Sequence, residues 1–177
     1  RISYERSETM IERYTLPRMR QVWEPENKFN KWLAIEILAC EALAEMGEVP
    51  GKAVGVIKER ASFDIERINQ IELDVKHDVI AFLSAVSERV GDEAKYLHMG
   101  LTSSDILDTG LALQLVDAAN IILEDLKRLK GVLKEKAYAY KDTVMIGRSH
   151  GVHAEPITLG LKMALWYEDT RRNIDRM

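Results

Sequence analysis

Residues 103–140 decide the fold, and they read SSDILDTGLALQLVDAANIILEDLKRLKGVLKEKAYAY. The stretch contains no proline, and its apolar residues recur every three or four positions, as they do along one face of an α-helix. This seam comprises Leu111, Leu115, Ala118, Ile122, Leu126, Leu129 and Leu133. At about 1.5 Å per residue, such a helix extends roughly 55 Å. We therefore predict one long helix, from Ser103 or Ser104 to about Tyr140, with the spacing of a bundle seam.

The first half of this predicted helix is apolar outside the seam as well. The additional apolar residues are Ile106, Leu107, Leu113, Val116, Ile121 and Leu123. A helix that is apolar on several sides has to be covered on several sides. We expect further helices of the same chain or other subunits to pack against it.

The remaining sequence is also helical in its periodicity. A helix is expected from about Glu26 to Met46, where apolar residues follow a helical spacing and Gly47 and Pro50 end the run. Further helices are expected over 51–60, after a cap at Ser62 or Asp64, from an N-cap at Asp78 to Gly91, and roughly over Pro156 to Met177. Strand signals are almost absent, with no Asn-Gly or Asp-Gly hairpin and no sustained alternation. The fold class is therefore predicted to be all-α.

The helices suggest two domains. Residues 10–100 are expected to form an N-terminal domain of short helices, and residues 101–177 to be the first part of a long-helix bundle. The last helix reaches Met177 without a C-capping signal, so we expect the bundle domain to be truncated. Residues 1–9 are polar and are expected to be a disordered or non-native leader.

Composition excludes several classes of protein. The 177 residues are 46% hydrophobic and 31% charged, which is typical of a packed globular chain. The formal net charge of −4 gives no global attraction for nucleic acid or anionic lipid, so neither is expected as a partner. No run approaches the ~18 uninterrupted apolar residues of a membrane span, and the N-terminus lacks the apolar core of a signal peptide. The single Cys40 fits a reducing compartment, and we expect a cytoplasmic location.

All four histidines fall at predicted helix junctions, where function is often located. The segment HMGLTSSD, residues 98–105, brings Thr102, Ser103 and Ser104 to the start of the long helix. Hydroxyls and free backbone N–H groups there would bind a carboxylate or phosphate at the positive end of the helix dipole. The alternative is that Ser103 or Ser104 only caps the helix, with Asp105 favourable in its first turn.

The segment GRSHGVHAEP, residues 147–156, is the second candidate. Its glycines permit a bent backbone that can present His150 at a cleft, where an imidazole can donate or accept a proton near neutral pH. A hydrogen-bonded turn between helices is the alternative. A zinc site formed by His150 and His153 with His77 or His98 is also conceivable, but no cysteine or clear fourth ligand supports it, and no metal is expected.

Two further groups complete the candidates. Lys76, His77 and Asp78 place a cation, an imidazole and a carboxylate together at a helix start, which would otherwise be a solvated junction. Arg13, beside Tyr14, offers a guanidinium that suits a phosphate. Together the four groups predict an anion-binding acid/base site.

The ordered motifs MIERY (10–14), KHDV (76–79), HMGLTSSD and GRSHGVHAEP resemble those of the adenylosuccinate lyases, in the fumarase/aspartase superfamily. The resemblance covers residues 10–177. TSSD is common to much of the superfamily, whereas the other three motifs point to the adenylosuccinate branch. The resemblance implies the all-α fumarase/aspartase-like fold. It also implies a homotetramer, because enzymes of this superfamily form homotetramers in which three subunits contribute to each active site.

The resemblance implies a cofactor-free β-elimination. Adenylosuccinate would give AMP and fumarate, and the succinylated carboxamide ribotide of purine synthesis would give its free carboxamide and fumarate. His150 matches the general acid that protonates the departing nitrogen, and His77 a second catalytic histidine. Matches to substrate-contacting positions are Arg13 and Tyr14 near the nucleotide phosphate, Thr102 and Ser103 at the succinyl carboxylates, and Lys76, Asp78, His98 and Ser149 elsewhere in the site.

Two departures from the family pattern are apparent. Ser149 stands where threonine is more frequent, which keeps the hydroxyl. The serine-rich loop that carries the catalytic base lies downstream of these motifs and outside the 177 residues, so the chain alone is expected to be inactive. His153 is expected to structure the loop. Another fumarate-releasing lyase, such as an argininosuccinate lyase, and a non-catalytic helical oligomerisation module remain as alternatives.

Overall fold

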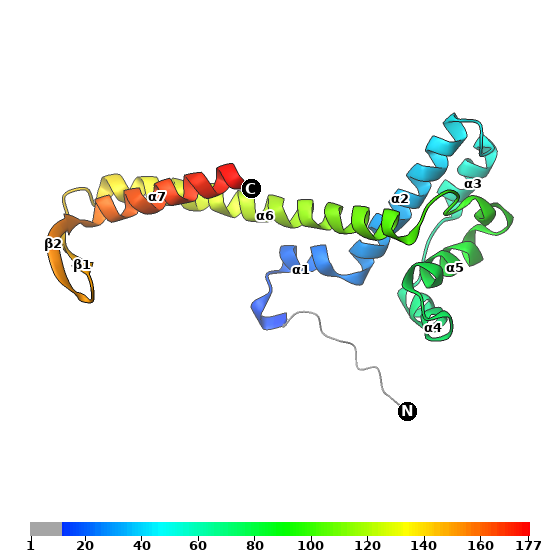
Figure 1. Cartoon of the computed structure of the whole chain (residues 1–177), viewed down its shortest axis with the longest axis horizontal. Helices are drawn as coiled ribbons and strands as arrows, with labels where there is room; N and C mark the ends of the chain where they lie inside the picture. The colour runs from blue at the N-terminus through cyan, green and yellow to red at the C-terminus, as the bar shows by residue number, and fades with distance from the viewer. Residues whose placement is uncertain (1–11) are drawn as a thin grey trace, which may run out of the picture. The chain divides into compact units, whose positions relative to one another are not determined.

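The computed structural model describes residues 12–177, so the expected leader at 1–9 lies outside the described residues. The described chain forms two compact units, which divide between Asp117 and Ala118 (Figure 1). The dividing point lies inside helix α6, Ser103–Ala139, so one continuous helix contributes its first part to one unit and its second part to the other. This helix confirms the predicted one at both ends to within a residue or two.

The first unit consists of helices joined by short turns. Its elements are η1 (Glu12–Tyr14), α1 (Pro17–Trp23), α2 (Pro25–Glu45), α3 (Gly51–Arg60), α4 (Ile65–Val75), α5 (Asp78–Val90), η2 (Asp92–Tyr96) and the start of α6. The predicted helices over 26–46 and 51–60 are confirmed as α2 and α3. The short elements η1 and α1 were not predicted, because neither is long enough to show a helical period.

Aromatic side chains form the centre of the core of this unit. Phe29 and Trp32 of α2 contact Phe82 of α5, with ring centroids 5.6 Å and 5.5 Å from it. All three side chains are buried, and Ile106 at the start of α6 is fully buried in the same cluster. The core therefore holds the first turns of α6 against α2 and α5.

The caps of α4 and α5 test two sequence predictions. Asp64, one of the two predicted caps of α4, accepts a hydrogen bond from the Arg67 N–H at 2.7 Å, so that prediction is confirmed. The predicted N-cap at Asp78 is wrong by one residue. His77 is the N-cap of α5, and its Nδ1 accepts from the Ile80 N–H at 3.4 Å. Asp78 is already helical and accepts from the neighbouring Val79 N–H instead.

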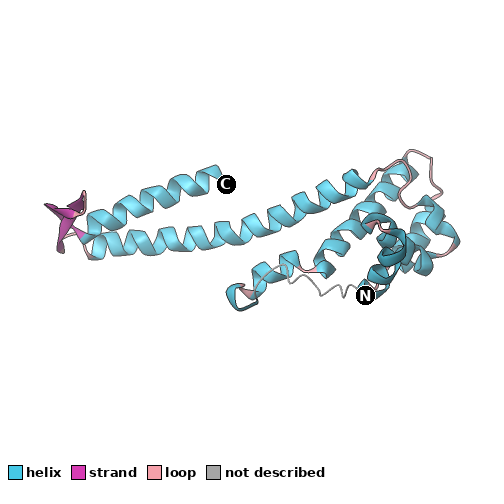
Figure 2. Cartoon of the chain, turned by 60° about the horizontal axis from the view of Figure 1, so that its bottom comes forward, coloured by secondary structure: helices cyan, strands magenta, loops and turns pink. Residues whose placement is uncertain are grey.

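The second unit contains the rest of α6, a β-hairpin and helix α7, Leu159–Arg176. The hairpin pairs β1, Val144–Ser149, with β2, Val152–Thr158, in antiparallel register, and is drawn in magenta in Figure 2. The seven α-helices in residues 12–177 confirm the all-α class, but the expectation that residues 147–156 form a loop between helices is wrong. The expected helix start at Pro156 is also wrong: Pro156 lies in β2 opposite Ile146, and α7 begins at Leu159 after the N-cap Thr158.

The residues in the turn of the hairpin explain why no hairpin was expected in this segment. His150 and Gly151 are the two residues between the strands, and both have positive φ, of 52° and 74°. Two such residues match a type I′ turn, which twists in the sense that paired strands require. Asn-Gly is the usual signal for this turn, and His-Gly takes its place here. The register also shifts between Ile146 and Arg148, which removes regular alternation from β1.

Helix α7 runs back along the second part of α6, as both Figure 1 and Figure 2 show. Gly160 makes this close approach possible, because a Cβ at that position would lie 2.6 Å from Lys141 Cα and closer still to the Ala137 carbonyl oxygen. The Gly160 N–H donates to the Tyr140 carbonyl at 2.8 Å. The glycine is therefore required where α7 begins.

Much of the predicted seam of α6 is exposed within this chain. Leu111, Leu115, Ile122 and Leu129 are between 41% and 52% exposed. By length and composition α6 is the one helix of the described residues that could cross a membrane, a test that helices covered by other helices also pass. Two polar contacts tie α6 to neighbouring helices: the buried Gln114 donates to the Val22 carbonyl at 2.7 Å, and the more exposed Asp117 pairs with Lys31 of α2 at 2.7 Å.

Candidate active site

Backbone strain marks three of the residues that the sequence singled out. Among residues 12–177, only Lys76, His98 and His150 combine a side chain with a positive φ, of 55°, 62° and 52°. The left-handed conformation costs a residue with a side chain about 1–2 kcal/mol, so it persists where the surrounding structure enforces it. Such residues concentrate at functional sites. Lys76 takes this conformation as the C-cap of a helix and His150 takes it in a tight turn, so local structure also accounts for it at these two positions.

The Lys76-His77-Asp78 segment forms the junction between α4 and α5. Lys76 is the C-cap of α4, and its N–H donates to the Glu72 carbonyl at 2.9 Å. The His77 and Asp78 side chains are 46% and 43% exposed, and His77 Nδ1 lies 3.6 Å from Asp78 Oδ1. Because Nδ1 accepts the N-cap hydrogen bond, a neutral His77 ring carries its proton on Nε2. His77 therefore presents an N–H donor to its surroundings.

Lys28 of α2 is a charged residue near this junction that the sequence analysis did not single out. Its ammonium lies 4.4 Å from the Phe29 ring centroid and 4.9 Å from that of Trp32. Burial lowers the pKa of Lys28, and the negative charges of Asp78 and Glu72 act in the opposite direction. The cation is thus partly desolvated, and the negative charge of the acidic member of the Lys76-His77-Asp78 group attracts it. In the sequence, Lys28 could have been recognised by its place beside the apolar residues of the predicted helix over 26–46.

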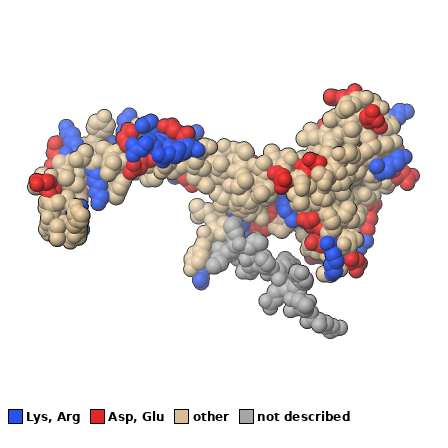
Figure 3. All heavy atoms as spheres, viewed as in Figure 1, with Lys and Arg blue, Asp and Glu red and all other residues tan. Residues whose placement is uncertain are grey.

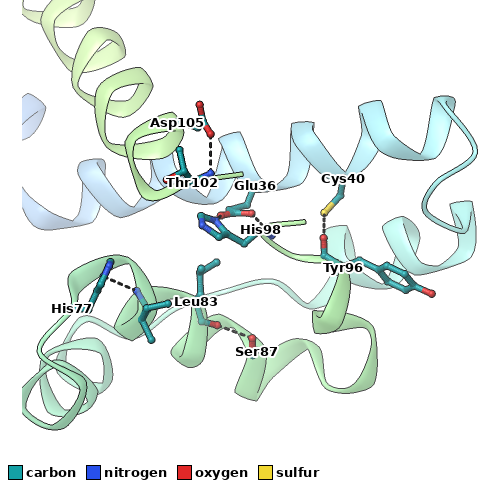
Figure 4. Close-up of polar contacts among 10 residues, drawn as sticks. Glu36, Cys40, His77, Leu83, Ser87, Tyr96, His98, Thr102 and Asp105 are labelled. Carbon is teal, nitrogen blue, oxygen red and sulfur yellow. Dashed lines mark hydrogen bonds and ion pairs between the residues drawn. The ribbon is translucent and has the colours of Figure 1, made fainter. Parts of the chain in front are cut away.

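His98 lies between η2 and α6, and Glu36 of α2 holds it (Figure 4). The Glu36 carboxylate accepts from the His98 backbone N–H at 2.7 Å and contacts Nδ1 at 2.7 Å. The His98 carbonyl in turn accepts from the Leu101 N–H at 3.2 Å. This turn leads directly into Thr102, so His98 and the start of α6 belong to one continuous, hydrogen-bonded segment.

The start of α6 is partly engaged within the chain. The Thr102 N–H donates to Asp105 Oδ2 at 2.8 Å, and the Asp105 N–H donates to the Thr102 carbonyl at 3.0 Å. This arrangement is the acidic half of a capping box. Asp105 therefore already occupies one backbone donor that the sequence analysis had assigned to an anion. The Thr102 side chain is exposed, and that of Ser103 is half-buried.

Ser149 and His150 lie in the second unit, at the end of β1 and in the hairpin turn. Both are exposed, as is His153, which pairs with Arg148 across the hairpin. Arg13 and Tyr14 lie in η1 with exposed side chains, and the Arg13 guanidinium carbon lies 4.8 Å from the Tyr14 ring centroid. The first unit thus brings His98 and Thr102 together, whereas His150 is presented by a separate unit.

Among residues 12–177, no group of three or more His, Cys, Asp or Glu side chains converges in a way that could hold a metal ion. Cys40 is buried, and its thiol donates to the Tyr96 carbonyl at 3.3 Å.

The family model of a group of lyases matches residues 12–177 of the chain. The chain belongs to this family of lyases, within the fumarase/aspartase superfamily. It is 56% identical over 167 residues to the adenylosuccinate lyase of Bacillus subtilis (strain 168) and 54% identical over 168 residues to that of Synechocystis sp.. These matches cover 94% and 95% of the chain, and they confirm the resemblance seen in the motifs.

The chain spans 39% of the length of these curated relatives. Solved structures with the same fold include 3-carboxy-cis,cis-muconate lactonizing enzyme from Pseudomonas putida, with a TM-score of 0.85 and 31% identity over 92% of this chain and 39% of that one. A fumarate lyase from Mesorhizobium sp. BNC1 has a TM-score of 0.84 and 28% identity, over 89% of this chain and 38% of the other. The structural matches therefore include members of the superfamily with different substrates.

Proposed function

We propose that this chain supplies part of the active site of an adenylosuccinate lyase, which releases fumarate from adenylosuccinate to give AMP and from the succinylated carboxamide ribotide of purine synthesis. The observation that carries the proposal is the 56% identity to the Bacillus subtilis adenylosuccinate lyase over 94% of the chain. The identity to the muconate lactonizing enzyme is lower, at 31%, although the fold similarity is high.

The chemistry requires two kinds of group. A C–H next to a carboxylate is weakly acidic, so donors must stabilise the charge that develops on the carboxylate, and the departing nitrogen needs a proton. We assign the succinyl carboxylates to Thr102 and Ser103, where the positive end of the α6 dipole favours an anion. His150 is assigned as the general acid. Its place in a tight turn supports this role, because the turn exposes the imidazole.

The other residues are assigned to binding and support. His77 is proposed as the second catalytic histidine, and its Nε2–H is available to the substrate or to His150. Contacts to the substrate are proposed for Lys76, Asp78, His98 and Ser149, and contacts near the nucleotide phosphate for Arg13 and Tyr14. The elimination moves protons and one C–N bond, so the proposed mechanism uses side chains without a cofactor.

We further propose that the enzyme is a cytoplasmic homotetramer with sites shared between subunits. The exposed apolar residues of α6 support this, because a soluble monomer rarely exposes so many large apolar side chains together. Figure 3 shows that much of α6 on the visible face carries no charged side chain, in contrast with α7. If α6 of other copies covers this apolar surface, no membrane is required to cover it. The net charge of −4 gives no global attraction for nucleic acid.

The test measures fumarate release from adenylosuccinate by the product of the complete open reading frame that encodes this chain. His150→Asn is the informative variant, because Asn tolerates the left-handed backbone of the turn but cannot act as the acid. It should lower kcat/KM by about 10²- to 10⁴-fold. Val144→Thr, in the same hairpin, is the matched control, because Val144 is 75% exposed and has no proposed role, and it should change kcat/KM by less than about threefold.

The 177-residue chain alone should release no fumarate. Release of fumarate from argininosuccinate rather than adenylosuccinate, or turnover of 3-carboxy-cis,cis-muconate, by the folded full-length protein would contradict the proposed substrate. A folded protein without lyase activity on any of these, and unaffected in assembly by His150→Asn, would instead indicate the helical oligomerisation module.

A further inference from the structure

Glu36 is a buried acidic residue in the middle of the apolar face of α2. Its side chain is 1% exposed and lies among Phe29, Trp32 and Cys40 of the core. Burying a carboxylate is costly unless hydrogen bonds satisfy it. An apolar residue at this position would complete the core face of α2. The presence of a carboxylate therefore requires a specific partner.

Both oxygens of Glu36 contact the same residue, His98, which lies 62 positions away in the sequence (Figure 4). Oε2 accepts from the His98 backbone N–H and Oε1 contacts the ring Nδ1, each at 2.7 Å. His98 has a φ of 62°, so its backbone is in the strained left-handed region. The two contacts fix both the backbone and the ring of this one residue.

The contacts also determine which ring nitrogen carries the proton. An ionised carboxylate only accepts hydrogen bonds, so His98 Nδ1 must donate to it. Nε2 is then the ring nitrogen left to meet a ligand, and the His98 side chain remains 21% exposed. His77 has the opposite arrangement, with Nδ1 accepting from the Ile80 N–H. The two histidines of the first unit are thus set as different tautomers by their own neighbours.

We propose that Glu36 is a positioning residue that acts through His98: it holds the left-handed backbone and keeps the proton on Nδ1, so that Nε2 faces the substrate. The kinetic consequence rests on the proposed function, whereas the tautomer is a property of the folded chain. Glu36 has no role of its own in the reaction, since its carboxylate is buried beneath the ring.

Glu36→Gln gives a specific structural prediction. Gln has one acceptor oxygen, and the His98 backbone N–H can only donate, so that oxygen takes the backbone contact. The Gln amide nitrogen then faces Nδ1, which must become an acceptor, and the ring proton moves to Nε2. Every hydrogen bond remains satisfied, so the variant should fold. Glu41→Gln is the matched control, because Glu41 is also on α2 but pairs with Lys58 at 2.5 Å, away from His98.

The first measurement is a ¹H–¹⁵N spectrum of the imidazole rings, with ¹⁵N-labelled histidine, in the product of the complete open reading frame that encodes this chain. The His98 signals are assigned by their loss in His98→Ala. We expect Nδ1 to be the protonated nitrogen of His98 in the unaltered chain and in Glu41→Gln, and Nε2 in Glu36→Gln. A His98 ring that is the same tautomer in all three proteins would overturn the proposal.

The second measurement is a double-mutant cycle on kcat/KM in the product of the complete open reading frame. Glu36→Gln should lower kcat/KM at least about tenfold, since a wrong tautomer impairs a histidine that is otherwise in place. In the His98→Ala background, the same substitution should change kcat/KM by less than about twofold. A similar loss in both backgrounds would show a merely structural role and overturn the proposal. If the protein releases no fumarate but the tautomer inverts, the proposed substrate fails while the positioning of His98 by Glu36 stands.

Discussion

The packing of α6 on α2 can be tested with a single added methyl group at Gly110. A Cβ at Gly110 would lie 2.9 Å from Trp32 Cδ1 and 3.0 Å from Trp32 Nε1. Trp32 is 2% exposed and cannot move away freely, because the rings of Phe29 and Phe82 contact it edge to face, with centroids 5.2 Å and 5.5 Å away. Gly110→Ala therefore forces an overpacked core.

The expected magnitude is a difference between two effects. Overpacking costs about 1–3 kcal/mol, whereas replacing a helical glycine by alanine gains up to about 1 kcal/mol. Gly110→Ala should therefore lower the free energy of unfolding by about 1 kcal/mol. Gly55→Ala in α3 is the control, since a Cβ there meets nothing within 4 Å. That variant should gain about 1 kcal/mol, so the two should differ by about 2 kcal/mol.

The assay is urea unfolding followed by tryptophan fluorescence in a Trp166→Phe background. This background leaves Trp23 and Trp32, so the signal reports on the first unit. Equal stabilisation by Gly110→Ala and Gly55→Ala would refute the packing of α6 on α2, and with it the placement of the Thr102 turn.

Three further predictions concern stability and the hairpin. Burial, with a smaller effect of the Glu36 charge, raises the pKa of the Cys40 thiol from 9.0 to about 11. The neutral thiol should therefore stabilise the folded state below pH 9, and this stabilisation should be lost as the pH rises to 11. In urea titrations, the difference in the free energy of unfolding between the parent and Cys40→Ala should narrow over that range. Asp64→Ala removes the cap of α4 and should lower the free energy of unfolding by about 1 kcal/mol, with Asp64→Asn nearly neutral in the same titration. Gly147→Ala would place a Cβ 2.5 Å from the Glu155 carbonyl oxygen, so hydrogen exchange should show loss of amide protection across the hairpin.

The helices were predictable because their periodicity is local. The spacing along α2 and α6 and the cap at Asp64 need only residues a few positions apart. The hairpin was missed because its turn is His150-Gly151 rather than Asn-Gly, and because the register shift near Gly147 removes alternation. In that segment, backbone conformation rather than side-chain pattern defines the strands.

The sequence motifs predict candidate site residues, but they do not predict the backbone conformation or the ring tautomer of those residues. Lys76, His98 and His150 were named from their motifs, and each has the left-handed backbone that functional residues often show. The tautomers of His77 and His98 were not predictable, since one depends on a cap and the other on Glu36, 62 residues away. The carboxylate of Glu36 on the apolar face of α2 was an available sequence signal, but it does not by itself identify His98 as the partner.

The most direct test of the proposed function is a chimera in which this chain replaces the matching segment, 39% of the length, of the Bacillus subtilis adenylosuccinate lyase. We expect the folded chimera to release fumarate from adenylosuccinate and His150→Asn in the chimera to lower this rate by at least about 10²-fold. A folded and assembled chimera that releases no fumarate, or one whose rate His150→Asn leaves unchanged, would contradict the proposed function.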